Sequence, residues 1–262
     1  MTVPQIAELL APAAWGTVDF ISDLHLTADE PATFAAWQHY LETTPADAVV
    51  ILGDLFEVWV GDDVVSPDFS YGVSFEDRCV QTMAAAAGRL ALFFMHGNRD
   101  FLVGQRLMDL CHATLLNDPT VLHFSNERLL LSHGDALCLA DTDYLKFRQQ
   151  VRSAAWQDSF LAKPLTERQS IARGLRTQSE ARKQSGQTYA DVDTDAAKEW
   201  LKAAAASTLI HGHTHQPNQH ELGDNLRRVV LSDWDAAASP PRAEVLRLTS
   251  TGLQRLPLAV ER

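Results

Sequence analysis

Strand-like apolar runs alternate with helix-like stretches through the first half of the chain. The runs TVDFIS (17–22), AVVILG (48–53) and ALFFMHG (91–97) predict strands, because they are short, apolar and rich in branched or aromatic residues. Residues 31–44 and roughly 71–88 are typical of helices. This alternation predicts a layered α/β domain.

The second half departs from this alternation. Residues 121–135, VLHFSNERLLLSHGD, predict a β-hairpin whose second strand is LLLSH. Residues 142–205 show no convincing strand pattern and predict consecutive helices, after which STLIH (207–211) predicts a short buried strand. The runs NQHEL, LRRVVLSDW and AEVLRLT predict closing antiparallel strands. We therefore expect a core formed by residues 1–141 and 206–262, with a helical cap at 142–205.

The predicted cap differs from the rest of the chain in charge. Residues 146–183 contain nine Lys or Arg against three acids, whereas the whole chain has a net charge of −12. Apolar residues are interleaved with these charges: Trp156, Phe160, Leu161, Leu165 and Ile171. A basic helical segment with exposed apolar residues is typical of a lid over an anionic amphiphile or of a membrane-surface element. An ordinary pair of solvated helices, with the apolar residues packed into the core, is the alternative.

Composition narrows the function classes. The net charge of −12 argues against general nucleic-acid binding, which requires a basic surface. Three cysteines without C-x-x-C spacing favour a reducing compartment and no disulfide framework. The first residues lack a basic leader region, and no apolar run approaches about 18 residues. We therefore expect a cytoplasmic protein that can still contact a membrane surface, and nothing implies a protein partner.

Histidines are concentrated in LIHGHTHQP, residues 209–217, directly after a predicted strand. If the chain leaves that strand at Gly212, His213 and His215 lie on the following loop and can turn toward one point. Neutral imidazole is the commonest protein ligand of metal ions, so this spacing suits a metal centre. Taken alone, the segment is equally compatible with a polar turn whose histidines are solvated.

Metal-type side chains also follow other predicted strands. In open α/β sheets ligands gather at the carboxyl ends of the strands. Five strand ends should therefore bring three oxygen donors and four imidazoles to one edge. Each of these residues alone would more often be a helix cap or a surface residue, but their joint occurrence predicts a metal site. The candidates are Asp23, His25, Asp54, Asn98, His133, His213 and His215, with Arg99 and Asp100 beside Asn98.

This donor set indicates the kind of centre. Mixed oxygen and nitrogen ligands suit Mn²⁺, Fe or Zn²⁺ rather than Ca²⁺ or a thiolate-bound ion. Seven ligands are too many for one ion and suit two ions that share a bridging carboxylate. Two ions roughly 3.5–4 Å apart can hold a hydroxide and neutralise a phosphoryl group during in-line attack. The pattern therefore predicts a hydrolase of phosphate esters or anhydrides.

Five blocks, D-x-H, G-D-x-x-E, G-N-R-D, H-G-D and G-H-T-H, span residues 23–215 and resemble the motifs of the calcineurin-like metallophosphoesterase superfamily. The resemblance implies a four-layer α/β/β/α sandwich with a dinuclear centre. In that pattern Asp54 would bridge two ions. One ion would be held by Asp23, His25, Asp54 and His215, and the other by Asp54, Asn98, His133 and His213.

Longer stretches resemble one family more closely, the UDP-2,3-diacylglucosamine diphosphatases of lipid A biosynthesis in Gram-negative bacteria. The similar stretches are ILGDLFEVWVGDD (51–63), FMHGNRDFLVG (94–104), SHGDALCLADTDYLKFR (132–148) and VLSDW (230–234). That family is Mn²⁺-dependent and splits a UDP-linked diacyl glucosamine into UMP and 2,3-diacylglucosamine 1-phosphate at the cytoplasmic face of the inner membrane. The resemblance implies the same substrate, two Mn²⁺ ions and a peripheral membrane location.

The resemblance also implies roles for single residues. Asn98, Arg99 and His213 would contact the substrate phosphates. Asp141, Ser179 and Lys183 would contribute further substrate contacts near or within the cap. Arg99 and His213 would stabilise the developing charge, and Asp54 would bridge the ions, as metal-activated hydroxide attacks the uridine-side phosphorus.

Two other interpretations differ from this one at defined places. A metallophosphoesterase acting on a soluble nucleotide-sugar or a cyclic nucleotide would share the metal site and differ at the cap. A non-catalytic scaffold that binds metal and docks a partner would not need Arg99 beside a complete ligand set.

Overall fold

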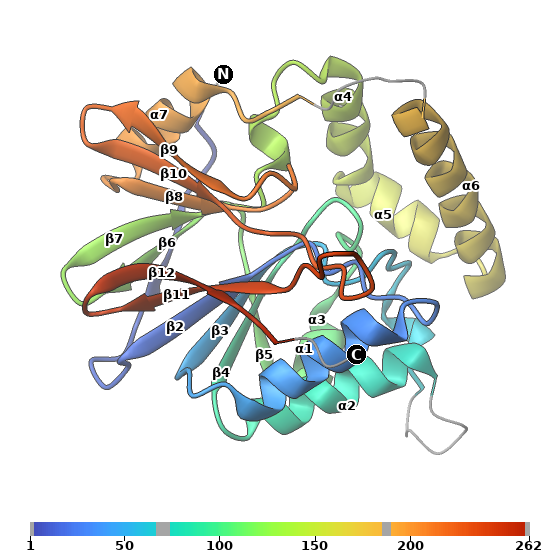
Figure 1. Ribbon diagram of the computed structural model, residues 1–262. Helices are drawn as coiled ribbons and strands as arrows, with labels where there is room; N and C mark the ends of the chain where they lie inside the picture. The colour runs from blue at the N-terminus through green and yellow to red at the C-terminus, as the bar shows by residue number, and fades with distance from the viewer. Residues whose placement is uncertain (1–2, 67–73, 185–189, 260–262) are drawn as a thin grey trace.

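Two six-stranded sheets stacked face to face form the centre of the computed structural model (Figure 1). The structure describes residues 3–66, 74–184 and 190–259, and within 177–184 it describes only the backbone. The first sheet has the order β12 (Gly252–Pro257), β11 (Glu244–Thr249), β2 (Thr17–Ile21), β3 (Ala48–Leu52), β4 (Ala91–Met95), β5 (Ala113–Leu116). The second sheet has the order β1 (Ala7–Leu10), β6 (Thr120–Phe124), β7 (Glu127–Leu131), β8 (Thr208–His211), β10 (Leu226–Val230), β9 (Asn218–Gly223).

Strand direction determines where the site can lie. Strands β2, β3, β4 and β5 are parallel to one another, so their carboxyl ends lie at one edge of the first sheet. In the second sheet β7, β8 and β10 are also parallel. Strands β6 and β7 form the predicted antiparallel hairpin, with Ser125 in the left-handed region at its turn. The loops that leave these two parallel sets are therefore the natural position of a site.

The interface between the two sheets is wholly apolar at its centre. Phe20, Val50 and Met95 project from the first sheet and pack with Leu131 and Ile210 of the second sheet. Every residue of β3 is buried, because one face of the strand meets the second sheet and the other meets a helical layer. This explains why β3 is continuously apolar, as is usual for a parallel strand covered on both faces.

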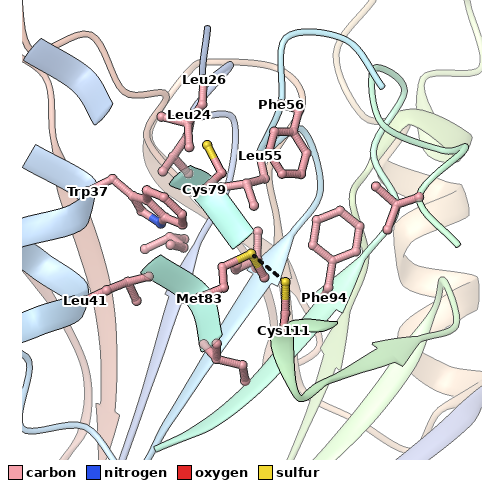
Figure 2. Packing of buried hydrophobic residues seen from close by; sticks show 14 of the residues in the cluster. Leu24, Leu26, Trp37, Leu41, Leu55, Phe56, Cys79, Met83, Phe94 and Cys111 are labelled. Atoms are coloured by element: carbon pink, nitrogen blue, oxygen red, sulfur yellow. Dashed lines mark hydrogen bonds between the residues drawn. The ribbon is translucent and has the colours of Figure 1, made fainter. Parts of the chain in front are cut away.

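A helical layer covers the outer face of the first sheet. It consists of α1 (Pro31–Thr43), α2 (Phe75–Ala87) and α3 (Gln105–Cys111). Figure 2 shows Trp37, Leu41, Met83 and Phe94 packed together in this cluster, where the Cys111 thiol donates to the Met83 sulfur at 3.8 Å. The three cysteines are buried and free, which confirms that they form no disulfide.

Helix α7 (Thr194–Ala203) covers the outer face of the second sheet. The Asp193 side chain caps its amino end by accepting from the Ala196 N–H, and Trp200 and Leu201 pack against Leu130 and neighbouring residues of that sheet. The predicted four-layer α/β/β/α sandwich is thus confirmed. Because α7 forms its fourth layer, the packing differs from the expectation that the cap extends to residue 205.

Three helices lie to one side of the sandwich: α4 (Thr142–Val151), α5 (Ala154–Leu161) and α6 (Leu165–Gln184) (Figure 1). We call α4–α6 the cap helices. The expectation of exposed apolar residues on them holds for Leu161 but is wrong for Phe160, which is buried in the core cluster. Trp156 is half-buried and stacks on Phe160 with ring centroids 4.7 Å apart. Much of the apolar surface on α5 therefore attaches the cap helices to the core.

Among the helices that the structure describes, none has both the length and the apolar character needed to span a bilayer.

Candidate metal centre and active site

Five loops converge where the two sheets meet. They follow β2, β3 and β4 of the first sheet and β7 and β8 of the second, and each begins with one of the sequence blocks named above. The expectation of a single sheet edge is therefore corrected, because the candidate ligands come from the aligned edges of two sheets. The stacking of the sheets brings together residues that are up to 192 positions apart, as the ion-pair distance between Asp23 and His215 shows.

Five candidate ligands have a left-handed backbone. The φ angles are 55° at Asp23, 48° at His25, 54° at Asp54, 68° at His213 and 53° at His215. Non-glycine residues in this region are uncommon, and each costs of the order of 1–3 kcal/mol unless the surroundings compensate for it. Because five such residues lie at one place, the structure accepts backbone strain there in order to direct these side chains toward the site.

The first ligand group is formed by Asp23, His25 and His215. The His215 Nε2 atom lies 3.3 Å from Asp23 Oδ1 and 3.2 Å from His25 Nε2. Asp23 Oδ2 accepts from the Ser22 hydroxyl and from the His213 N–H, whereas Oδ1 is buried and has no hydrogen-bond partner among the described residues. A buried carboxylate oxygen and two imidazole nitrogens that face one another fit a divalent cation.

The second ligand group contains Asp54, Asn98, His133 and His213. Asn98 Oδ1 lies 3.0 Å from His133 Nε2 and 2.8 Å from His213 Nδ1. The His133 Nδ1 atom lies 2.9 Å from the Leu52 carbonyl oxygen and can donate to it, which leaves Nε2 directed into the site. Asp54 Oδ2 lies 3.8 Å from His133 Nε2 and 3.9 Å from His25 Nε2. Asp54 therefore lies between the two groups, where a bridging ligand would lie.

The local charges act differently on two of these imidazoles. Burial opposes the charged form of His133, but the carboxylates of Asp54, Asp135 and Asp23 raise its pKa to about 9. Burial and the neighbouring His133 lower the pKa of His213 to about 4. His213 is therefore neutral at neutral pH, whereas His133 would have to release its proton on binding a metal ion.

Asp100 fixes the loops that carry Asp54 and Asn98. Its carboxylate accepts from the N–H groups of Leu55 and Gly97 at 2.8 Å and from that of Asp54 at 3.3 Å. Burial and the neighbouring Asp54 carboxylate raise the pKa of Asp100 to about 7. All of these contacts are to backbone, so the last residue of the G-N-R-D block organises the site rather than facing it.

Two glycines explain part of the motif pattern. Gly53 has a φ of 87°, and a Cβ atom there would lie 2.6 Å from the Gly97 Cα atom and from His133 Nδ1. A Cβ atom at Gly97 would overlap the Asp54 carboxylate. The blocks G-D and G-N-R-D therefore need glycine because their backbones touch at the point where Asp54 is positioned.

Arg99 faces the site with an unsatisfied donor. Its backbone N–H donates to Asp54 Oδ1 at 2.8 Å, and its side-chain Nη1 atom lies 3.7 Å from Glu57 Oε1. The Nε atom is buried and has no hydrogen-bond partner among the described residues. A buried guanidinium donor without a partner is costly, and an anionic ligand would satisfy it.

Two acidic residues around the site, Glu57 and Asp135, were not among the candidates predicted from the sequence. Asp135 accepts from the Tyr144 hydroxyl at 2.5 Å and from Arg148 Nε at 2.8 Å, and the Tyr144 ring stacks on that of His213 with centroids 6.0 Å apart. Both acids lie within the recognised blocks G-D-x-x-E and H-G-D. Their place in those blocks was the available signal, and only the fold shows which groups they contact.

The candidate contacts in the cap are less closely tied to the site. Asp141 caps α4 by accepting from the Tyr144 N–H at 3.0 Å, which gives its carboxylate a structural partner. Ser179 and Lys183 belong to the end of α6, where the side chains lie outside the described part of the structure. Their roles stay predictions.

Several basic residues of the cap helices bind the core. Arg148 contacts Asp135, and Arg152 Nη2 donates to the Gly97 carbonyl at 2.8 Å. Arg168 is buried and contacts the Val60 carbonyl and Asp63 in the segment after β3. These partners show that part of the local positive charge attaches the cap helices to the core.

Comparison with known proteins agrees with this arrangement. Residues 16–217 match the calcineurin-like phosphoesterase family. The chain belongs to the calcineurin-like phosphoesterase family. Members of this family are metal-dependent hydrolases, so this phosphoesterase is an enzyme. Two sets of its side chains are close enough together to hold a divalent ion: Asp23, His25 and His215 in one, and Asp23, Asp54 and His133 in the other.

Three curated relatives of this phosphoesterase are each named UDP-2,3-diacylglucosamine hydrolase. The relative from Chromobacterium violaceum is 44% identical over 92% of this chain and 98% of its own length. The relative from Ralstonia nicotianae is 44% identical over 89% of both chains. The relative from Enterobacter sp. (strain 638) is 40% identical over 90% of this chain and 96% of its own. The similarity therefore extends beyond the metal motifs to the cap helices.

Proposed function

We propose that this phosphoesterase hydrolyses the pyrophosphate bond of UDP-2,3-diacylglucosamine to give UMP and 2,3-diacylglucosamine 1-phosphate. The observation that carries the proposal is a cluster of candidate metal ligands in a chain that is 44% identical, over 92% of its length, to a relative named for this substrate. Arg99 beside the ligand set supports hydrolysis of an anionic substrate over metal storage.

The ions are proposed to be two Mn²⁺. Mixed carboxylate, amide and imidazole donors suit this ion. Asp54 lies within 3.9 Å of imidazoles from both ligand groups, which supports its role as the bridge. When bound, such ions would supply Lewis-acid stabilisation of the charge that develops on a phosphoryl group. The first ion would be held by Asp23, His25, Asp54 and His215, and the second by Asp54, Asn98, His133 and His213.

The chain's own residues would bind and orient the pyrophosphate. Arg99 is proposed to donate its unpartnered Nε–H to a phosphate oxygen, because a guanidinium binds phosphate through directed hydrogen bonds. Asn98 and His213 would contact the same phosphates, since their side chains meet at 2.8 Å at the base of the site. The Tyr144 ring on His213 would keep that imidazole in place and exclude water from its outer face.

The cap helices are proposed to receive the acyl chains and to contact the cytoplasmic face of the inner membrane. Among the described residues, five large apolar side chains are well exposed, and three of them lie on α4–α6: Phe147 (39%), Leu161 (42%) and Leu175 (41%). Lys146, next to Phe147, is also exposed. Exposed apolar residues with neighbouring lysines are typical of helices that lie on an anionic membrane. Asp141, Ser179 and Lys183 stay proposed substrate contacts.

A soluble nucleotide-sugar is the alternative substrate. The burial of Phe160 and the packing of Trp156 favour this alternative, because both side chains pack against the protein core and are not free to contact an acyl chain. The same metal chemistry would apply.

The deciding experiment compares Mn²⁺-reconstituted hydrolysis of UDP-2,3-diacylglucosamine with that of its deacylated analogue, both in detergent micelles, with UMP release as the readout. We expect a strong preference for the acylated compound. Reaction in ¹⁸O-labelled water should place the label in UMP, because attack is proposed at the uridine-side phosphorus. Comparable rates on both compounds would assign the enzyme to soluble substrates, and label in the sugar phosphate would reverse the direction of attack.

A further inference from the structure

Glu57 contacts three groups that serve different parts of the site. Its Oε2 atom lies 3.1 Å from His25 Nδ1. Its Oε1 atom lies 3.3 Å from Arg176 Nε on α6 and 3.7 Å from Arg99 Nη1 in the G-N-R-D loop. The Glu57 side chain is only 15% exposed, so these contacts are largely shielded from solvent. One carboxylate thus connects a candidate metal ligand, a candidate phosphate ligand and the cap.

The contact with His25 determines which imidazole nitrogen faces the ion. The two atoms lie 3.1 Å apart, and an ionised carboxylate can accept hydrogen bonds but cannot donate them, so this contact favours the tautomer of His25 that carries its proton on Nδ1. The other nitrogen, Nε2, is then unprotonated in the neutral ring, and it lies toward His215 Nε2 and Asp54 Oδ2. A carboxylate behind a histidine ligand fixes the ring tautomer and raises its basicity in this way.

Backbone geometry places Glu57 behind His25. The loops after β2 and β3 run side by side, with a parallel bridge between Leu26 and Phe56 and a hydrogen bond of 3.2 Å from the Glu57 N–H to the Leu26 carbonyl. The position of the Glu57 carboxylate is therefore defined by the same loop pairing that positions His25 and Asp54.

The second oxygen of Glu57 holds two guanidinium groups at the seam between core and cap. Arg99 and Arg176 would repel each other if no carboxylate lay beside them, and the shared carboxylate keeps both near the ligand groups. Arg176 lies on α6, so its ion pair with Glu57 also links this cap helix to the site.

We propose that Glu57 is a positioning residue with two tasks: it orients His25 for metal binding, and it holds Arg99 and Arg176 for recognition of a phosphate anion. The second task rests on the proposed function, whereas the first requires only that the protein binds a divalent ion. Glu57 itself would touch neither the ion nor the substrate.

Three substitutions separate the two tasks. Glu57→Gln keeps a side-chain oxygen that can accept from His25 Nδ1 but removes the charge that holds the arginines. Glu57→Ala removes both the acceptor oxygen and the charge. Arg176→Gln disturbs only the second task. Glu167→Ala is the matched control, because Glu167 is an exposed acid on α6 that pairs with Lys163 one helical turn away.

The first measurement is calorimetric titration of chelator-stripped protein with Mn²⁺, which needs no substrate. Glu57→Ala should weaken Mn²⁺ affinity by about 10-fold or more, as loss of a partner behind a ligand usually does. Glu57→Gln, Arg176→Gln and Glu167→Ala should remain close to wild type. Wild-type affinity in Glu57→Ala would overturn the first task, even if the substrate proposal is correct.

The second measurement is the affinity of Mn²⁺-saturated protein for inorganic phosphate. Glu57→Gln and Arg176→Gln should both weaken it several-fold, because the arginines lose their fixed geometry. If Glu57 merely placed a negative charge near the anion, Glu57→Gln would strengthen phosphate binding instead, and that result would overturn the second task. Failure of wild-type protein to hydrolyse the acylated substrate would refute only the proposed substrate, since both titrations are independent of it.

Discussion

At the scale of single residues, the buried aspartates fall into two kinds. Asp19 is saturated by Tyr40, Thr44 and Arg247, which together donate to both of its oxygens. Asp23, in contrast, keeps one buried oxygen without a partner among the described residues, although it is equally buried. An unsatisfied buried carboxylate oxygen costs stability, so its presence indicates a ligand. In this pair, saturation therefore distinguishes the structural residue Asp19 from the candidate ligand Asp23, which sequence position alone does not.

Asp77 is a structural aspartate whose effect on stability should depend on pH. It accepts from the Ser66 N–H and hydroxyl and completes a capping box with Ser74 at the start of α2. Burial opposes its charge, but the donors of Ser66 and Ser74 hold its pKa below the usual value. A lowered carboxyl pKa contributes stability that is present above the unfolded value of about 4 and is lost as the pH falls through the folded value.

Asp77→Asn should therefore lower the free energy of unfolding by roughly 1–2 kcal/mol near neutral pH. The difference from wild type should shrink as the pH falls below about 4, because wild type then loses the same charge. Urea unfolding at a series of pH values measures this. Asp109→Asn, at an exposed acid on α3 that accepts from Gln105, serves as the control and should change little. A difference that stays constant across the series would contradict the role of the charge.

At the scale of elements, the strands that the sequence did not predict all lie at sheet edges. The central strands β2, β3 and β4 are buried runs and were predicted almost to the residue. The missed strands are β1, β5 and β12, which are edge strands of their sheets. An edge strand pairs on one side and remains partly exposed, as the mixed burial of β1 shows, so it needs no continuous apolar run.

Helix α7 lies within the predicted cap, residues 142–205, yet it packs on the second sheet. Ala196, Ala197, Trp200 and Leu201 form one buried face, which is the pattern of a helix that packs on a sheet. The sequence pattern of consecutive helices without an intervening strand does not indicate that the last helix packs against the sandwich. Whether this helix packs on the sandwich depends on the second sheet, whose open face is defined only after β8 has paired with β7 and β10 with β8.

Helix α5 offers a comparison between adjacent residues. Phe160 is 6% exposed and belongs to the core cluster, whereas the next residue, Leu161, is 42% exposed. Phe160→Ala should lower the free energy of unfolding by about 3 kcal/mol and increase hydrogen exchange along α5. Leu161→Ala should cost about 0.5 kcal/mol or less, since surface truncations rarely cost more. Urea unfolding with hydrogen-exchange mass spectrometry tests both. Equal losses in the two variants would show that the cap packs differently.

At the scale of the whole molecule, the site exists because two sheets end at the same place. The sequence could name seven candidate ligands, since each follows a predicted strand inside a recognisable block. It could not predict that Tyr144 stacks on His213 or that Glu57 lies behind His25, because such contacts depend on how loops from different elements pair. The sequence therefore indicated which residue types could bind a metal ion, whereas the contacts that orient those residues could be identified only in the folded structure.

The same geometry makes metal binding a link between the sheets. Asp23, His25 and Asp54 come from the first sheet, and His133, His213 and His215 come from the second. Ions bound between them would stabilise the folded chain only, by about 2.7 kcal/mol for each site at an ion concentration of 100 times the dissociation constant. For a chain of this size the melting temperature of chelator-stripped protein should then rise by roughly 5–10 °C when Mn²⁺ saturates both sites.

Two histidine variants separate the contributions of the ions. His123→Ala should keep the full rise, because His123 lies on β6 beside Glu8 and Arg128, away from both ligand groups. His215→Ala removes a ligand from the first group alone, so about half of the rise should remain, and calorimetry should count one strongly bound ion in place of two. A full rise in His215→Ala would place the first ion elsewhere. No rise in wild type would mean that these donors hold no ion, and the predicted dinuclear centre would be wrong.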